Sequence, residues 1–295
     1  MASWQSKILN PVLRLMVKRK LRKSHDAVGI RKAFGGVLPV PRGAKFSADV
    51  VGGVAGEWAK SGAGTAGTML YLHGGGYLGG SAATHRPITA AFAIRGLDVF
   101  VPDYQLAPEN PFPAAVNDGL AAYKGLLNAG IAPAKLTIAG DSSGGGLALA
   151  TLLAAKAEAV PMPACAILLS PWTDLAGTGE SLFRNRDRDA MLVGDKIEFT
   201  AAFYLNGADP KNPLASPLYG DLAGLPPLLI TVGDTEVLLD DSTRFAARAQ
   251  EQGVAVSLKI WEGMPHVWQL FQLVLPEARA ATDAAGRFAK AHFSR

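Results

Sequence analysis

The chain has 295 residues, 49% of them hydrophobic and 18% charged, a composition that excludes a disordered or fibrous protein. Its single cysteine, Cys165, excludes an intramolecular disulfide and suits a reducing compartment. The net charge of +4 is modest, and its positive excess is concentrated in residues 18–23. We interpret that cluster as a solvated helix face rather than a surface for nucleic acid or membrane, because no other basic patch supports binding.

The sequence of residues 1–40 predicts an amphipathic helical segment, because apolar side chains recur on one face. Such a segment cannot bury that face alone, so we expect it to lie on another part of the protein. Pro11 and Arg14 interrupt the stretch that most resembles a secretory signal, and no cleavage site follows it. No apolar run approaches the ~20 residues that a membrane-spanning helix needs. We therefore expect a soluble, cytoplasmic protein.

The rest of the chain alternates strands with helices. Strands are expected at 50–59 (a pair broken by Gly-Gly), 68–72, 97–101, 136–139, 165–169, 228–232 and 256–261, and helices at 114–127, 237–252 and 277–292. This order predicts an α/β fold with a mostly parallel sheet covered by helices on both faces. The alternation pauses within 177–225, which is rich in charge, proline and aromatic residues. We divide the chain into N-terminal cap helices (1–45), a first core part (46–176), an inserted cap segment (177–225) and a second core part (226–295).

Residues 140–144 read Gly-Asp-Ser-Ser-Gly, between a strand pattern and a helix pattern. A G-x-S-x-G sequence in that setting is typical of a nucleophile elbow, which exposes its serine at a sharp turn. The turn forces positive φ on Ser142, and the residues two before and two after it must lack side chains. The alternative is an ordinary glycine-rich turn from strand to helix.

A serine hydroxyl needs a base, and five histidines are candidates. His25 and His292 lie in predicted surface helices, His85 suits helix capping, and His73 suits a role in holding the glycine run that follows it. His266 follows the last predicted strand, at the strand end where α/β sheets present their chemistry. We therefore assign His266 as the base.

Two carboxylates, Asp234 and Glu236, follow the preceding strand, where the acid that orients the base is expected. Either could instead cap the following helix.

Residues 73–76, His-Gly-Gly-Gly, match a loop that supplies backbone N–H groups to an oxyanion. The alternative is a flexible or phosphate-binding loop. However, the glycine spacing fits neither of two common nucleotide-binding motifs, G-x-x-x-x-G-K-[ST] and G-x-G-x-x-G. No His, Cys or Asp cluster has metal-ligand spacing, so we expect no metal and no cofactor.

Together these motifs resemble the hormone-sensitive-lipase-like branch of the α/β-hydrolases, the bacterial family IV esterases. The resemblance runs from about Val50 to the C-terminus and includes 73–76, 103–109 (Asp-Tyr-Gln-Leu-Ala-Pro-Glu), 111–115 (Pro-Phe-Pro-Ala-Ala), 140–145 and 170–172 (Ser-Pro-Trp).

The resemblance implies an α/β-hydrolase fold with a helical cap and assigns a role to each candidate. Ser142 is the nucleophile and His266 the base; the oxyanion donors are Gly75, Gly76 and Ser143. The family's acid stands in an Asp-x-Leu sequence, and here Glu236-Val237-Leu238 occupies that register, so Glu236 is expected to be the acid. The chain departs from the family in this Glu and in Gln105, which replaces an arginine and is expected to loosen a structural ion pair.

The implied function is a serine carboxylesterase that hydrolyses short-chain acyl esters through an acyl-enzyme. A lactone hydrolase with the same triad is an alternative; the opening residues 1–6 look similar to proteins of that activity. A small-ligand receptor on the same fold is a second alternative, which His266 disfavours because such receptors lack the histidine. We expect an ester substrate, no nucleic-acid partner and no membrane span; the oligomeric state, a homodimer included, stays open.

Overall fold

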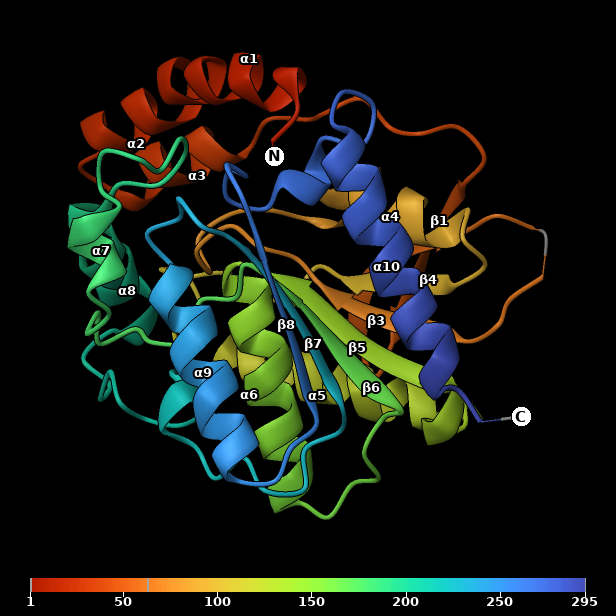
Figure 1. Cartoon of the computed structure of the whole chain (residues 1–295). Coiled ribbons are helices and arrows are strands. Elements are labelled where there is room, and N and C mark those ends of the chain that lie inside the picture. Colours follow the sequence, from red (N-terminus) through yellow and green to blue (C-terminus); the bar gives the residue numbers. More distant parts are fainter. Residues whose placement is uncertain (1, 63, 295) are drawn as a thin grey trace.

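A computed structural model of the chain describes residues 2–62 and 64–294 (Figure 1). Its strands are β1 (Lys45–Val51), β2 (Val54–Lys60), β3 (Thr68–Leu72), β4 (Asp98–Pro102), β5 (Leu136–Asp141), β6 (Cys165–Leu169), β7 (Leu228–Gly233) and β8 (Val256–Trp261). The α-helices are α1 (Trp4–Leu13), α2 (Arg19–Lys23), α3 (Ala27–Phe34), α4 (Ala82–Ala93), α5 (Ala114–Asn128), α6 (Ser143–Ala157), α7 (Ser181–Arg184), α8 (Ile197–Leu205), α9 (Leu239–Glu251) and α10 (Pro276–His292). A π-helical turn, η1 (Arg14–Lys18), joins α1 to α2, and short 3-10 helices are η2 (Pro133–Lys135), η3 (Gly194–Lys196), η4 (Pro217–Tyr219) and η5 (Trp268–Leu270).

The eight strands form one sheet in the order β1-β2-β4-β3-β5-β6-β7-β8. The first two strands form a hairpin, and β2 runs antiparallel to β4; every later pairing is parallel. Gly52 and Gly53 close the hairpin with φ of 60° and 82°, which suits the two-residue turn that twists with its strands. The predicted α/β fold with a mostly parallel sheet is confirmed.

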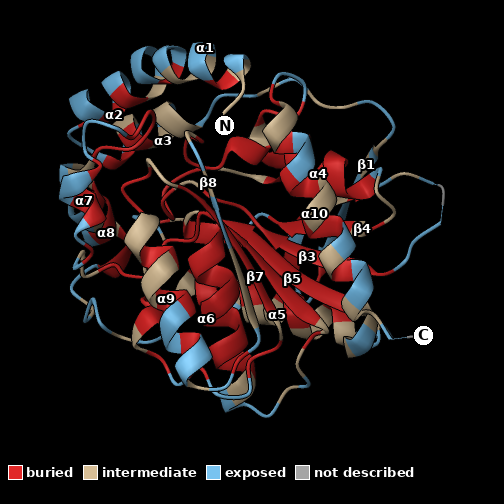
Figure 2. Cartoon of the chain, viewed as in Figure 1, coloured by how far each residue is buried: buried red, intermediate tan, exposed pale blue. Residues whose placement is uncertain are grey.

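Central strands are buried on both faces because helices cover each side (Figure 2). In β3, Leu70 and Leu72 face a core that also includes residues of α5, α6 and α9. Met69 and Tyr71 point the other way, into a core with residues of α4 and α10. The alternation along one strand thus supplies both hydrophobic layers.

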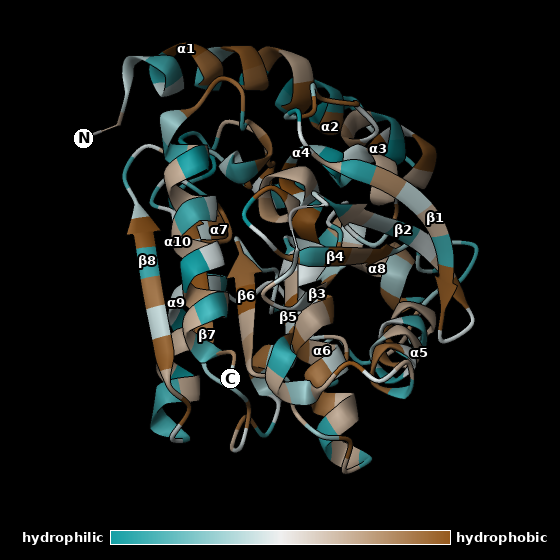
Figure 3. Cartoon of the chain, turned by 90° about the vertical axis from the view of Figure 1, so that its right-hand side faces the viewer, coloured by the Kyte–Doolittle hydropathy of each residue, from teal (hydrophilic) through white to brown (hydrophobic). Residues whose placement is uncertain are grey.

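The N-terminal helices lie across the end of the sheet where the arrowheads of β6 and β8 point (Figure 3). Residues of α1, η1 and α3 pack partly on the core: Leu13 and Ile30 are buried, whereas the opposite side of α1 is exposed. The predicted helical character of this segment is confirmed as far as Phe34, beyond which residues 35–44 run without helix. Within the described residues, no helix has the length and apolar character needed to cross a membrane.

Candidate active site

The turn between β5 and α6 places Ser142 at its tip with φ 53° and ψ −124°. A Cβ on Gly140 would lie 2.2 Å from the carbonyl oxygen of Gly144, and a Cβ on Gly144 would lie 2.1 Å from the carbonyl oxygen of Leu72. Both glycines are therefore required sterically, as the sequence motif predicted. Ser142 directly precedes the first turn of α6, where unpaired N–H groups favour negative charge.

Glu236 and His266 meet behind this serine, although 30 residues separate them in the chain. The Oε2 atom of Glu236 lies 2.6 Å from His266 Nδ1. Its other oxygen, Oε1, accepts hydrogen bonds from the N–H of Gly233 at 2.6 Å and from the hydroxyl of Ser170 at 2.8 Å. One carboxylate oxygen is thus fixed by the protein, and the second is aimed at the imidazole.

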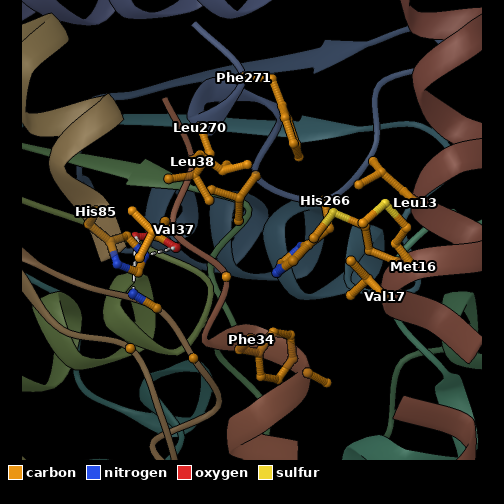
Figure 4. A pocket seen from close by; sticks show the side chains of 18 of the residues that line it. Leu13, Met16, Val17, Phe34, Val37, Leu38, His85, His266, Leu270 and Phe271 are labelled. Carbon is orange, nitrogen blue, oxygen red and sulfur yellow. Dashed lines mark hydrogen bonds and ion pairs between the residues drawn. The ribbon is translucent and has the colours of Figure 1, made fainter. Parts of the chain in front are cut away.

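His266 is buried on the loop after β8, and its ring projects into a pocket (Figure 4). Its Nε2 atom is buried and has no hydrogen-bond partner among the described residues. Burial alone would lower the pKa of His266, but the charge and hydrogen bond of Glu236 raise it above the ordinary value of 6.5. The arrangement leaves one ring nitrogen available on the pocket side and the other held by a carboxylate.

The second candidate acid, Asp234, points elsewhere. Its Oδ1 accepts the backbone N–H of Gly263 at 2.7 Å, and its Oδ2 lies 3.3 Å from the guanidinium of Arg188. These contacts tie together the loops that follow β7 and β8. The two neighbouring carboxylates therefore have different partners, and only Glu236 contacts His266.

The glycine loop after β3 and the start of α6 present three adjacent backbone donors. Within the described part of the chain, the N–H groups of Gly75, Gly76 and Ser143 have no acceptor. The N–H groups on either side of the two glycines are bound: Gly74 donates to Asp141 Oδ1 at 3.1 Å, and Tyr77 donates to Ser143 Oγ at 3.3 Å. The loop is anchored at both ends and leaves its central donors free.

Asp141 anchors this loop from beneath. It is buried and accepts a hydrogen bond from Tyr71 Oη at 2.7 Å as well as from Gly74, and His85 Nε2 lies 3.4 Å from its other oxygen. Burial on its own would raise the pKa of Asp141, but His85 and the hydrogen bond from Tyr71 lower it overall. Asp141 is thus held as an anion below the serine.

The remaining histidines have structural surroundings. His73 Nδ1 lies 2.9 Å from the carbonyl of Gly74, and burial together with neighbouring His85 lowers the pKa of His73 to about 3. Ser81 and Thr84 cap α4 with reciprocal hydrogen bonds, and the predicted capping role of His85 is limited to a contact of its Nδ1 with the Thr84 hydroxyl at 3.0 Å. His85 instead turns inward toward Asp141, a contact that its helical position alone did not indicate.

Ser142 lies between two cavities of unequal size. The larger has a volume of about 480 Å³ and is lined by Ser142 and His266 together with apolar side chains of the N-terminal helices and the loop after η5 (Figure 4). The smaller, of about 30 Å³, is lined by Ser142 and Gly76 together with residues that include Trp172, Ile197 and Thr200. His266 lines only the larger cavity.

Side chains from residues 185–189 support the loop that carries Glu236. Asn185 Nδ2 donates to the carbonyl of Glu236 at 2.8 Å, and Asp189 Oδ2 accepts the N–H of Val237 at 2.9 Å. Lys18 then holds this segment from the N-terminal helix: its buried ammonium donates to the carbonyls of Arg186 at 2.6 Å and of Asp189 at 2.7 Å. Sequence reasoning missed all three side chains, since none stands in a motif.

No group of three or more His, Cys, Asp or Glu side chains that could hold a metal ion occurs in ranges 2–62 and 64–294. The arrangement described above offers a hydroxyl, an imidazole paired with a carboxylate, and a set of free backbone donors; Ser142, His266 and Gly75 line the same cavity. Those groups are the ones that acyl transfer through a serine requires.

Comparison with known proteins agrees with this chemistry. Residues 69–270 match the family described as alpha/beta hydrolase fold. An acetyl-hydrolase of Streptomyces hygroscopicus is 44% identical over 259 residues, which cover 88% of this chain and 85% of that protein. The crystal structure of EstE5 soaked in ethyl alcohol superposes with a TM-score of 0.95 at 41% identity, and that of an esterase from the bacterial hormone-sensitive lipase family with 0.91 at 38%; each match covers both chains completely.

Replacement of Lys18 by Met should destabilise the protein while keeping most of the apolar stem. The buried carbonyl of Asp189 and the part-buried carbonyl of Arg186 would lose their donor, which costs about 1–3 kcal/mol and lowers the melting temperature by about 2–6 °C. Arg19→Met is the matched control, because Arg19 is exposed and adjacent. Equal melting temperatures for the two variants, measured by scanning calorimetry, would contradict the role of Lys18.

Proposed function

Since the chain belongs to the α/β-hydrolase fold family, in its hormone-sensitive-lipase branch of carboxylic ester hydrolases, we propose that it cleaves short-chain acyl esters with Ser142, His266 and Glu236. The observation that carries this proposal is the state of His266. Its Nδ1 is held by Glu236, while its Nε2 is unpaired within the described structure and borders the pocket that Ser142 also lines.

In the proposed reaction, Ser142 Oγ attacks the ester carbonyl carbon while His266 Nε2 takes the hydroxyl proton. The carbonyl oxygen becomes an oxyanion that accepts hydrogen bonds from the N–H groups of Gly75, Gly76 and Ser143. His266 returns the proton to the leaving alkoxide, which departs as an alcohol and leaves an acyl-serine. Water then attacks the acyl carbon with the same base, and the carboxylic acid departs with Ser142 restored.

The two cavities favour one orientation of the ester. The leaving oxygen must lie near His266, which lines only the larger cavity. The alcohol portion therefore belongs in the larger cavity and the acyl tail in the smaller. A volume of about 30 Å³ holds only two or three water-sized groups at ~10–15 Å³ each, which suits an acetyl or propionyl tail. The activity printed for the Streptomyces relative, an acetyl-hydrolase, is consistent with this inference.

We propose further that residues 1–45 and 177–225 act as the cap over this site. Support comes from the lining of the larger cavity, which includes Leu13, Val17 and Phe34 from the first segment and Met191 from the second. Lys196 Nζ also donates to the carbonyl of Ser24 at 2.8 Å, which joins the two segments. A cap of this kind sets the size of the substrate rather than the chemistry.

Replacement of Ser142 by Ala should abolish hydrolysis of p-nitrophenyl acetate, because the attacking atom is lost. We expect kcat to fall by about 10⁴-fold or more, with an unchanged circular dichroism spectrum and melting profile. A fluorophosphonate probe should label the wild type and leave the variant unlabelled. Turnover of the purified variant within tenfold of wild type would rule out Ser142 as the nucleophile.

Glu236→Gln should reduce kcat by about 10³- to 10⁴-fold with little change in KM, because the amide cannot stabilise the imidazolium. Asp234→Asn is the matched control: Asp234 lies two residues away and binds Gly263, so its loss should lower stability and spare kcat. The assignment of the acid would be reversed by a catalytic loss in Asp234→Asn together with near-normal Glu236→Gln.

The pH profile of the same pair gives an independent readout. His266 acts as a base only when neutral, and its pKa is raised by Glu236, so kcat/KM of the wild type should rise with pH through a midpoint above 6.5. Removal of the Glu236 charge lowers the pKa of His266. The midpoint of the pH profile of kcat/KM should therefore lie at a lower pH in Glu236→Gln than in the wild type. An unchanged midpoint would disconnect Glu236 from the titrating group.

Across p-nitrophenyl esters of increasing acyl length, kcat/KM should fall at least tenfold between acetyl and octanoyl. Ile197→Ala enlarges the smaller cavity and should move the optimum toward butyryl or hexanoyl. Leu273→Ala, at the rim of the larger cavity, is the control and should keep the acyl preference of the wild type. If Leu273→Ala changed acyl preference and Ile197→Ala did not, the proposed orientation of the ester would be wrong.

A further inference from the structure

Exposed apolar side chains surround the mouth of the larger cavity. Five of its large hydrophobic lining residues are solvent-exposed, with exposed fractions between 42% and 73%: Val12, Met16, Val37, Leu273 and Val274. They come from three separate segments, namely the helix α1 with its π-helical continuation, the stretch after α3, and the loop before α10. An apolar rim built from three segments is larger than the scattered exposed residues of an ordinary surface.

The apolar surface continues away from the mouth along α1. Trp4, Ile8 and Leu15 are each about 60% exposed or more, and none of them lines the cavity. Ile8, Val12 and Met16 follow one another at intervals of four, so they share one face of the helix, while Leu13 is buried on the other. Figure 2 shows much of α1 as exposed at the edge of the molecule, and Figure 3 shows that hydrophobic and hydrophilic stretches alternate along it. We call these eight exposed residues the mouth patch.

Positive charge is concentrated on the same helices. The first 25 residues contain seven of the chain's 29 Lys and Arg residues and no Asp or Glu, so the rest of the chain carries a net negative charge. One of the seven, Lys18, is buried against the inserted segment; the exposed ones are Lys7, Arg14, Arg19, Lys20, Arg22 and Lys23. Among the carboxylates near these helices, Asp26 caps α3, Glu277 binds the N–H and hydroxyl of Ser3, and Asp187 and Asp189 lie near the buried Lys18. The segment is thus amphipathic and carries an excess of positive charge.

We propose that the mouth patch docks on the surface of an anionic phospholipid bilayer, which revises our interpretation of residues 18–23 as only a solvated helix face. An exposed tryptophan, aliphatic side chains and flanking cations on one helix form the combination that binds at a lipid interface without spanning it. Each cation near an anionic surface strengthens the attachment. A second copy of the chain is a poorer occupant, because self-association through this patch would bring two highly cationic segments together.

Docking in this orientation places the cavity mouth against the lipid. If the proposed esterase function holds, an ester dissolved in the bilayer can enter the larger cavity between Val37 and Leu273 without first crossing into water. The docking itself does not depend on catalysis, since its residues Trp4, Ile8 and Leu15 lie outside the cavity lining.

Vesicle sedimentation tests the docking directly. The full chain should bind vesicles of phosphatidylcholine mixed with phosphatidylglycerol at least tenfold more tightly than vesicles of phosphatidylcholine alone, and added salt should weaken the binding. A triple variant, Trp4→Ser with Ile8→Ser and Leu15→Ser, should lose at least tenfold in affinity. A charge variant, Lys7→Glu with Arg22→Glu and Lys23→Glu, should lose at least tenfold on the anionic vesicles.

The matched control is Val50→Ser with Lys45→Glu on β1, an exposed apolar and cationic pair outside the patch, which should bind vesicles like the wild type. All variants should hydrolyse soluble p-nitrophenyl acetate within twofold of the wild type, a readout that separates docking from catalysis. Absent binding to anionic vesicles, or equal binding by wild type and patch variants, would overturn the proposal. So would light scattering in which the patch variants convert an oligomer into a monomer while vesicle binding stays unchanged.

Discussion

The close approach of backbone to backbone around Ser142 is the constraint on which the rest of the site depends. Because Gly140 and Gly144 lack side chains, β5 can turn into α6 against the carbonyl of Leu72 at the end of β3. The same turn sets Ser143 below the glycine loop, where its hydroxyl binds the N–H of Tyr77. One steric condition therefore fixes the serine and both ends of the loop that carries the free donors.

The contacts of Glu236 show how the fold directs one carboxylate oxygen toward His266. Its Oε1 takes hydrogen bonds from Ser170 and Gly233, and those bonds determine where Oε2 meets His266. Ser170 itself has φ of 48°, and its hydroxyl also accepts the N–H of Val267 at 3.3 Å. The strained backbone at Ser170 thus places one hydroxyl between the loop that carries Glu236 and the loop that carries His266.

Sequence patterns predicted the parts of this protein that depend on local chemistry. Strand and helix periodicity indicated the sheet, and the glycine motifs indicated Ser142 and the donor loop, because such turns tolerate few residues. They could not predict Lys18, Asn185 or Asp189, whose roles arise only when the folded chain brings irregular segments together. Gln105 illustrates the same limit: its side-chain and backbone N–H groups both bind Asp118, at 3.2 and 2.8 Å, a pairing that no sequence pattern indicated.

The N-terminal segment connects the exposed mouth patch to the loop that carries Glu236 through a short series of contacts. Its exposed face carries the mouth patch, and its buried face carries Lys18, which holds the carbonyls of residues 186 and 189. Asp189 in turn binds the N–H of Val237, next to Glu236. A helix that shifted on contact with a lipid surface would therefore move the support of Glu236, the proposed acid, through two hydrogen bonds. Because η1 is a π-helical turn at this point, the segment departs from regular helix where its exposed and buried functions meet.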